Sequence, residues 1–245
     1  MNLSGAKRIQ IALAVVMVIA ALRVAIIFYE RSRPIETKKS AERASSYRMT
    51  EDDYVHLPKV FPYDLKSASK ELSGQMVWVR AGNQLPYYSF STATRRVALG
   101  RKLGLLAPLE RLGIKDFILQ NGLKPSKQRQ IMVIFTRVGD GIQYATQAGI
   151  EEQGSYNFYV NDAFFLKDPH QLYKHWPAEI WDAIDHQQVK LGMNELQVGL
   201  AVGTSATAGS GDYGNRTMEY TNAGKPVTVT FSDNRAIKVE QNTGQ

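Results

Sequence analysis

The sequence predicts an α+β protein that combines a membrane helix, a small β domain and a C-terminal unit of helices and strands. Three observations lead to this prediction. Residues 9–29 form an almost unbroken apolar run, and residues 76–166 contain short apolar segments separated by turn residues, as in small barrels and sandwiches. Residues 176–240 show helical spacing followed by period-2 alternation. We therefore divide the chain into residues 1–30, 31–72, 73–167 and 168–240, with a tail at 241–245.

The apolar run over residues 9–29 is long enough to cross a membrane, since about 20 helical residues span the hydrocarbon layer. Lys7 and Arg8 precede it, as in a signal sequence, and its A-x-A triplet, which begins at Ala12, lies inside the run. We therefore expect an uncleaved anchor in the lipid bilayer, with Arg23 reaching the interface. The alternative, a buried helix of a globular domain, is disfavoured because no polar face can be drawn.

The charges leave open which side of the membrane carries the rest of the chain. The first 50 residues contain nine Lys/Arg and three Asp/Glu, and the cations after the span favour a cytoplasmic C-terminal part. The short basic N-terminus is instead typical of a signal anchor. We expect a single-pass inner-membrane protein whose soluble part is periplasmic, with the cytoplasmic side as the alternative.

Residues 31–72 are polar and read as a tether, with a short helix from Asp64 to Leu72. The strands expected after it cover residues 76–79, 85–90, 131–138, 142–146 and 156–166, with one or two more within 103–119. Together they predict a small all-β barrel or sandwich. The opening L-x-G-x-x-VWV, which begins at Leu72, is similar to a bacterial Src-homology-3-type barrel. This similarity implies a fold and no functional residue.

The C-terminal unit is expected to begin with two helices. Pro177 suits a first helical position, and Ile180, Trp181 and Ile184 form an apolar stripe after it. Asn194 is an N-cap with Gln197 three residues later, as in a capping box.

Three strands should follow these helices. Apolar residues alternate with polar ones over 217–220, 227–231 and 237–239, and residues 222–225 and 232–234 provide the turns. The unit is therefore predicted to hold two helices and a three-stranded antiparallel sheet.

The segment VKLGMNELQV at residues 189–198, with the two strands that end the chain, resembles the SmpA/OmlA (BamE-like) domain over about 65 residues. Gly203-Thr204 departs from the Gly-x-Pro of that family, and a small-residue loop at 204–211 is inserted. The chain has no cysteine, so the lipid anchor of BamE does not carry over. The resemblance implies a fold and binding to other envelope proteins.

Candidate catalytic residues do not form a recognisable constellation. His170 and His175 lack the i, i+4 spacing of a helical metal pair, and His186 with Asp182 and Asp185 is better explained as an exposed helix face. The glycine-rich stretch at 209–214 leads into a strand and cannot cradle a phosphate as a helix start does. We therefore predict no catalytic, cofactor or metal site and no small-molecule ligand.

Two compositional features bear on partners. Aromatic residues are too numerous for one face of a small sheet, so either some form an exposed recognition surface or all pack in the core; they are Tyr87, Tyr88, Phe90, Tyr156, Phe158, Tyr159, Phe164 and Phe165. Within the expected folded domains, clustered cations of the kind that bind nucleic acid occur only at residues 95–96 and 101–102, so nucleic acid is not an expected partner.

These observations predict a membrane-tethered bacterial envelope protein that is not an enzyme and acts as a protein-binding or scaffold module. The alternatives are a module that binds cell-wall glycan and a hydrolase of unrecognised type. The expected partner surface is the solvated strand face together with a mobile loop at 204–214; its residues are Thr217, Glu219, Thr228, Thr230 and Lys238.

Overall fold

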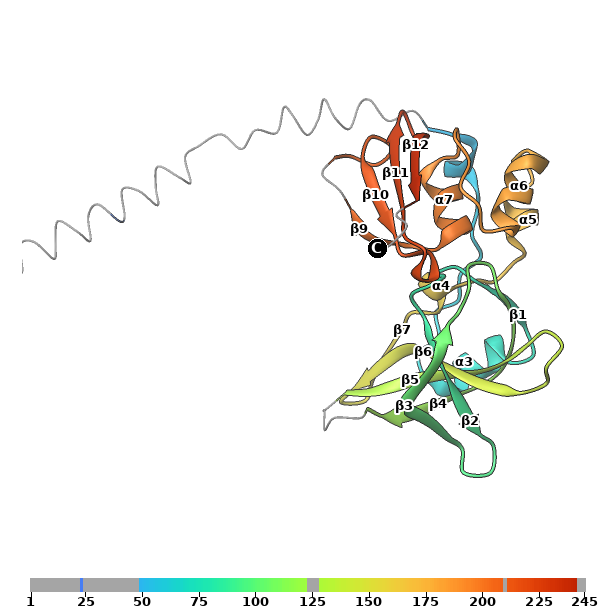
Figure 1. The fold of residues 1–245 in the computed structure, drawn as a ribbon. Coiled ribbons are helices and arrows are strands. Elements are labelled where there is room, and N and C mark those ends of the chain that lie inside the picture. The colour runs from blue at the N-terminus through green and yellow to red at the C-terminus, as the bar shows by residue number, and fades with distance from the viewer. Residues whose placement is uncertain (1–22, 24–48, 123–127, 209–210, 242–245) are drawn as a thin grey trace, which may run out of the picture. The chain divides into compact units, whose positions relative to one another are not determined.

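The structure, a computed structural model, describes residues 49–122, 128–208 and 211–241 together with Arg23, and for residues 205–208 it describes the backbone alone. The described residues from Thr50 onward belong to one compact unit (Figure 1). Two sheets and several short helices make up the described part of this unit.

The first sheet is antiparallel and has eight strands in the order β3-β2-β6-β5-β4-β1-β8, with β7 beside β6. The strands are β1 (Met76–Val79), β2 (Pro86–Ser91), β3 (Arg96–Leu105), β4 (Arg111–Asn121), β5 (Gln128–Arg137), β6 (Gln143–Glu152), β7 (Ser155–Phe158) and β8 (Phe164–Phe165). The end strands of this path, β3 and β8, do not pair with each other, so the sheet remains open.

Strand β5 is the centre of this sheet because it is buried on both faces. Ile131, Val133 and Phe135 lie in one core, and Met132 and Ile134 lie in a second core on the opposite face. Full burial of each such side chain stabilises the fold by about 1.5–3 kcal/mol. A strand with both faces covered does not need polar alternation, which explains the continuous apolar run.

Strand β3 curls over the face of β4. Val97 of β3 is buried in the second core, and its N–H donates to the side chain of Gln120, 3.3 Å away. Arg95, just before β3, forms an ion pair with Asp116 of β4 at 2.7 Å. The beginning of β3 is therefore covered by β4, although the two strands share no ladder.

Helix α3 (Leu65–Leu72) confirms the helix expected before the β domain. Asp64 is its N-cap and accepts a hydrogen bond from the Ser67 N–H at 2.6 Å. Ala68 and Leu72 are buried in the first core of the sheet, so α3 is part of the folded domain although we assigned it to the tether. Two further short helices are α4 (Val160–Ala163) and α5 (Pro169–Leu172).

The C-terminal part consists of α6 (Ala178–Asp185), α7 (Glu195–Val202) and a second antiparallel sheet of β9 (Ser205–Ala208), β10 (Thr217–Tyr220), β11 (Val227–Ser232) and β12 (Arg235–Gln241). The expected capping box is present, since the Gln197 N–H donates to Asn194 at 2.8 Å and the Asn194 N–H donates to Gln197. Met193 and Val198 are fully buried beside it. Pro177 precedes α6 as its N-cap and is not its first helical residue.

The predicted fold class is nevertheless wrong. The described residues are mostly β, with an open eight-stranded sheet in place of a small barrel or sandwich. The C-terminal sheet has four strands where we expected three. The additional strand β9 comes from the loop at 204–211, and it pairs with β10 because the backbone groups along that edge of β10 would otherwise lack partners.

The prediction of a membrane helix, a signal anchor and a single-pass inner-membrane location is also corrected. Within the described ranges no helix is long and apolar enough to span a bilayer. The three longest, α3, α6 and α7, have eight residues each, whereas a span needs about 20. The run at 9–29 on which the prediction was based lies outside the described residues except for Arg23.

The two sheets are joined by a close backbone contact. The Asn83 side chain donates from Nδ2 to the carbonyl of Val202 at 2.9 Å, and the Thr204 N–H donates to the Gly82 carbonyl at 3.3 Å. Gly203 lies between them with a φ of +90°, and a Cβ there would stand 2.6 Å from the Gly82 carbonyl oxygen. Only glycine therefore allows this approach.

Candidate functional site

The structure places the five predicted surface residues on one face of the C-terminal sheet. Thr217 pairs with Thr230, Glu219 with Thr228, and Thr230 with Lys238 across the ladders. Directly opposed residues share a face, while Met218 and Val229 between them point into the core. The five residues therefore share one face of the sheet.

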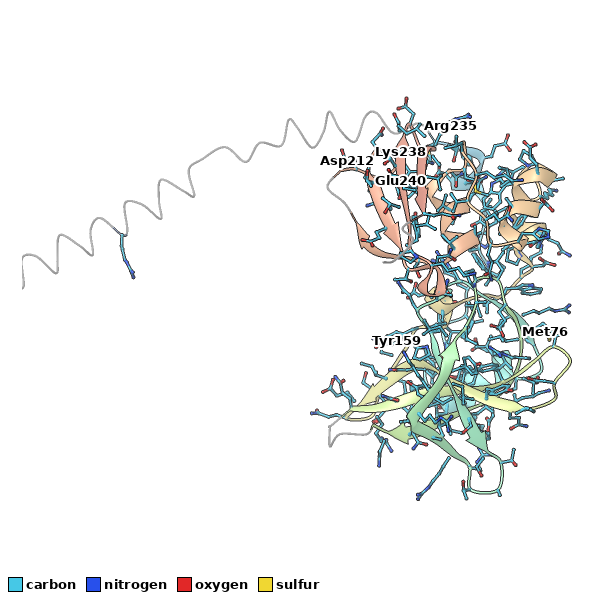
Figure 2. All side chains as sticks on the ribbon, viewed as in Figure 1. Met76, Tyr159, Asp212, Arg235, Lys238 and Glu240 are labelled. Atoms are coloured by element: carbon cyan, nitrogen blue, oxygen red, sulfur yellow. The ribbon has the colours of Figure 1, made fainter. Side chains whose placement is uncertain are left out.

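This face shows the features of an ordinary solvated surface. The hydroxyls of Thr217 and Thr230 lie 3.1 Å apart, and Lys238 forms an ion pair with Glu240 at 2.8 Å. Figure 2 shows Lys238 and Glu240 on the same strand, β12. These contacts are ordinary for an exposed sheet face, so the face alone does not indicate a partner.

A different surface is formed by residues 50–64, which we call the strap. The strap begins with a 3-10 turn (Glu51–Tyr54) whose Asp52 carboxylate accepts three hydrogen bonds from the C-terminal unit. The donors are His175 Nε2 at 2.6 Å, the Trp176 indole at 2.6 Å and Asn194 Nδ2 at 2.7 Å. These bonds fix the beginning of the strap against α7.

The rest of the strap is fixed to the first sheet. Asn161 accepts a hydrogen bond from the Val60 N–H at 3.0 Å and donates one to the Val60 carbonyl at 2.7 Å. Arg80 donates to the Asn161 carbonyl at 3.0 Å and so holds Asn161 in place. Val55 and Leu57 pack against the C-terminal core. The strap is therefore attached to both sheets, although the sequence suggested a tether.

Three aromatic side chains of the strap point into solvent. Tyr54, Phe61 and Tyr63 are 74%, 79% and 77% exposed. Beside Phe61 the strap borders an open hollow of about 510 Å³, lined also by Val55, His56, Leu57 and Lys59. Exposed aromatic side chains gathered in one short segment are a candidate binding surface.

Seven of the eight aromatic residues singled out in the sequence belong to the hydrophobic cores or pack against them, and Tyr159 is the exception. Phe164 and Phe165 are buried, and the other six are half-buried. Tyr87 and Tyr144 pack edge to face at 5.5 Å, and Phe117 and Phe158 do so at 6.2 Å. Packing therefore accounts for these seven aromatic residues, and the exposed aromatic rings lie in the segment that we assigned to the tether.

The histidines are held by carboxylates in separate places. His170 stacks on Trp181 with ring centroids 4.0 Å apart, and its two ring nitrogens lie 3.2 Å from Asp168 and from Asp185. His186 bonds within α6 through the Asp182 carbonyl at 2.7 Å. Among the described residues no three His, Asp or Glu side chains are grouped so as to hold a metal.

His175 and Asp52 are arranged like the imidazole and carboxylate of a general acid–base pair, with His175 Nε2 hydrogen-bonded to the carboxylate. Catalysis by such a pair requires a third group that reacts, placed within hydrogen-bond reach of the imidazole. Within the part of the chain that the structure describes, no hydroxyl is hydrogen-bonded to His175. What the structure shows for this pair is a contact of 2.6 Å that ties the strap to the C-terminal unit.

A buried ion pair fixes the loop before β10. Glu195 is almost fully buried and is paired with Arg216 at 2.7 Å, and it accepts a further bond from the Gly214 N–H at 2.6 Å. The hydrogen bond to Glu195 raises the pKa of the Arg216 guanidinium, which remains charged. Part of the loop expected to be mobile is thus attached to α7.

Comparisons with protein-family models, with curated proteins and with solved structures found no match for this chain. The resemblance of the C-terminal third to the SmpA/OmlA domain and the similarity of the middle region to a Src-homology-3-type barrel therefore rest on their sequence motifs alone.

Proposed function

We propose that the unit formed by residues 50–241 is a non-catalytic protein-binding module and that the strap is its binding surface. The observation that supports this proposal is the exposure of Tyr54, Phe61 and Tyr63 within ten residues. The partner that fits is a protein with an apolar groove or patch able to enclose aromatic rings.

The exposed rings favour a partner because each leaves a large apolar area in water. Burying apolar surface contributes about 25 cal/mol per Å², and aromatic anchors carry much of the binding energy in protein interfaces. The polar sheet face with Glu219 and Lys238 offers no comparable gain, since exposed ion pairs contribute about 0–1 kcal/mol.

The attachment of the strap also favours binding. The hydrogen bonds of Asp52 and Asn161 hold the strap at two points, so less conformational entropy is lost when a partner binds. Between these points, no backbone hydrogen bond to the described residues forms at His56, Leu57 or Lys59. A partner can therefore contact both the rings and the open backbone.

The test uses a photo-crosslinking residue placed at position 61 of the full-length chain in cells, with position 219 on the sheet face as the comparison. The protein captured at position 61 is then purified, and its affinity for the chain is measured by calorimetry. The double variant Phe61→Ser/Tyr63→Ser should bind at least tenfold more weakly, which corresponds to about 1.4 kcal/mol.

Ile237→Ser provides the matched control, because Ile237 is an exposed apolar residue of the C-terminal sheet. It should leave the affinity unchanged. A partner that crosslinks only at position 219, and whose binding is weakened by Glu219→Lys but not by the strap variant, would transfer the function to the sheet face.

A second candidate function is recognition of a cell-wall glycan, and the hollow beside Phe61 favours it specifically. Sugar rings stack on exposed aromatic faces, and Lys59 and His56 on the border of the hollow can donate hydrogen bonds. Cosedimentation of the full-length chain with purified peptidoglycan, abolished by Phe61→Ser and competed by soluble glycan fragments, would support this function. If the chain remains in the supernatant, the glycan candidate is excluded.

A further inference from the structure

The stretch between Glu71 and Glu110 contains no aspartate or glutamate but five cationic residues. They are Arg80, Arg95, Arg96, Arg101 and Lys102. Four of them belong to the β2–β3 hairpin, at the end of the first sheet. This hairpin is separate in sequence from the strap and is not needed for the function proposed above.

The four cations of the hairpin differ in whether they form an ion pair. Arg95 is paired with Asp116 at 2.7 Å. Arg96, Arg101 and Lys102 are exposed, and none of them has a carboxylate within 4.0 Å in the ranges that the structure covers. The hairpin therefore carries three exposed cations that form no ion pair with the described residues.

The second half of β3 is also an open strand edge. Among the described strands β3 pairs only with β2, and the register of this ladder shifts between Val97 and Lys102 and again between Lys102 and Gly104. Before the first irregularity the strand is covered by β4 through Asp116 and Gln120. After it, no described strand pairs with the outer edge of residues 102–105, and regular pairing with β2 resumes at Gly104. An open edge presents unpaired backbone N–H and C=O groups.

Two exposed leucines lie on this open edge. Leu103 is 45% exposed and Leu105 is 39% exposed. Many proteins place cationic side chains and β-bulges on an edge strand, where they prevent aggregation through that edge. Exposed leucines beside the cations make this protection weaker. They can also pack against an apolar side chain of a strand that binds along the edge.

We propose that the edge of β3 at residues 102–105 binds an extended acidic segment of a partner protein, which adds to the sheet as a further strand. Backbone hydrogen bonds would provide affinity, carboxylates would pair with Arg101 and Lys102, and apolar residues would cover Leu103 and Leu105. Single-stranded nucleic acid fits less well, because the aromatic residues of β2 that could stack on bases, Tyr88 and Phe90, pack on the sheet core.

The test measures fluorescence anisotropy of a labelled ten-residue peptide that alternates glutamate and valine, titrated with the full-length chain at low and at physiological salt. Arg101→Glu/Lys102→Glu should weaken binding at least tenfold. Lys66→Glu/Lys70→Glu changes the net charge equally on the exposed face of α3 and should weaken it less than threefold. Equal losses in the two variants would show general charge attraction and overturn the proposal.

Two further probes separate the modes of binding. A peptide of the same sequence with alternate amides N-methylated keeps its charge but cannot complete a ladder, so it should bind at least tenfold more weakly. Equal binding of the two peptides contradicts strand addition. A 20-nucleotide single-stranded DNA that displaces the peptide and binds more tightly would identify a nucleic-acid surface and also overturn the proposal.

Discussion

At the scale of single residues, the described structure depends on a few polar side chains that join segments distant in the sequence. Asp52 is the strongest case, because its carboxylate accepts hydrogen bonds from His175, Trp176 and Asn194. The distance along the chain between Asp52 and these donors exceeds 120 residues, so the network holds only in the folded protein. Asn161 acts in the same way for the middle of the strap.

Asp52→Asn should destabilise the protein by about 1–3 kcal/mol, since three donors then share a neutral amide that accepts fewer and weaker bonds. The unfolding free energy from urea titration gives the measurement. Glu51→Gln, an exposed neighbour in the same turn, should change it by less than about 0.5 kcal/mol. Equal small effects of both changes would show that the strap is not held through Asp52.

The surroundings of Glu151 predict that the free energy of unfolding depends on pH. The hydrogen bonds from Arg129 and from the Gly154 N–H lower the pKa of this carboxyl below its usual value. A lowered pKa contributes stability that is complete above about pH 4.3, the unfolded value, and is lost as the pH falls through the folded value. Glu151→Gln should therefore cost stability at pH 7 and progressively less below pH ~4, in urea unfolding followed across pH. The neighbouring exposed change Glu152→Gln should show a much smaller pH-dependent difference.

At the scale of elements, short helices are stabilised by caps because none is long enough to be stable alone. Helix α7 begins at the Asn194 capping box and ends at Gly203, and its buried residues include Val198 and Leu200. The amide of Asn194 also contacts Asp52, so the same side chain serves the helix and the strap.

Two changes at Asn194 can separate these roles. Asn194→Ser keeps an oxygen for the Gln197 N–H and loses the donor to Asp52, whereas Asn194→Ala loses both. We expect Asn194→Ala to cost about 1–3 kcal/mol and Asn194→Ser to cost about half as much, measured by thermal and urea unfolding. Gln188→Ala on the exposed surface is the control. Identical costs for Ser and Ala would mean that the cap contributes nothing.

At the scale of the whole described unit, the two sheets depend on the contact between residues 82–83 and 202–204. This contact has no room for a side chain at Gly203, whose φ is +90°. Coupling of the sheets through Asn83 and Gly203 implies that they unfold together.

Gly203→Ala should destabilise the unit by more than about 2 kcal/mol, through backbone strain and collision with the Gly82 carbonyl. Gly199→Ala in α7 is the matched control, because a Cβ there meets no atom within 4 Å. It should stabilise the protein by about 0.5–1 kcal/mol through higher helix propensity. Urea unfolding followed by circular dichroism provides both values, and a loss for Gly199→Ala equal to that for Gly203→Ala would contradict the proposed contact.

The sequence by itself determined the local elements whose signals are contained in a few neighbouring residues. Spacing and turn chemistry predict the caps at Asp64 and Asn194. They also predict the alternation over 217–220 and 227–232, and with it the solvated face that carries Thr228 and Thr230. These features depend on contacts between residues close in sequence or directly paired across short turns.

Only the tertiary structure decided how these elements combine. Contacts between residues far apart in the chain set the order of the strands and attach the strap through Asp52. The pairing of β9 with the edge of β10 is also part of the tertiary structure. Burial has the same origin: Phe61 and Phe165 have equal hydrophobicity, yet one is exposed and the other lies in the core. The position of a side chain relative to a sheet is set by long-range packing, which periodicity in a single sequence does not encode.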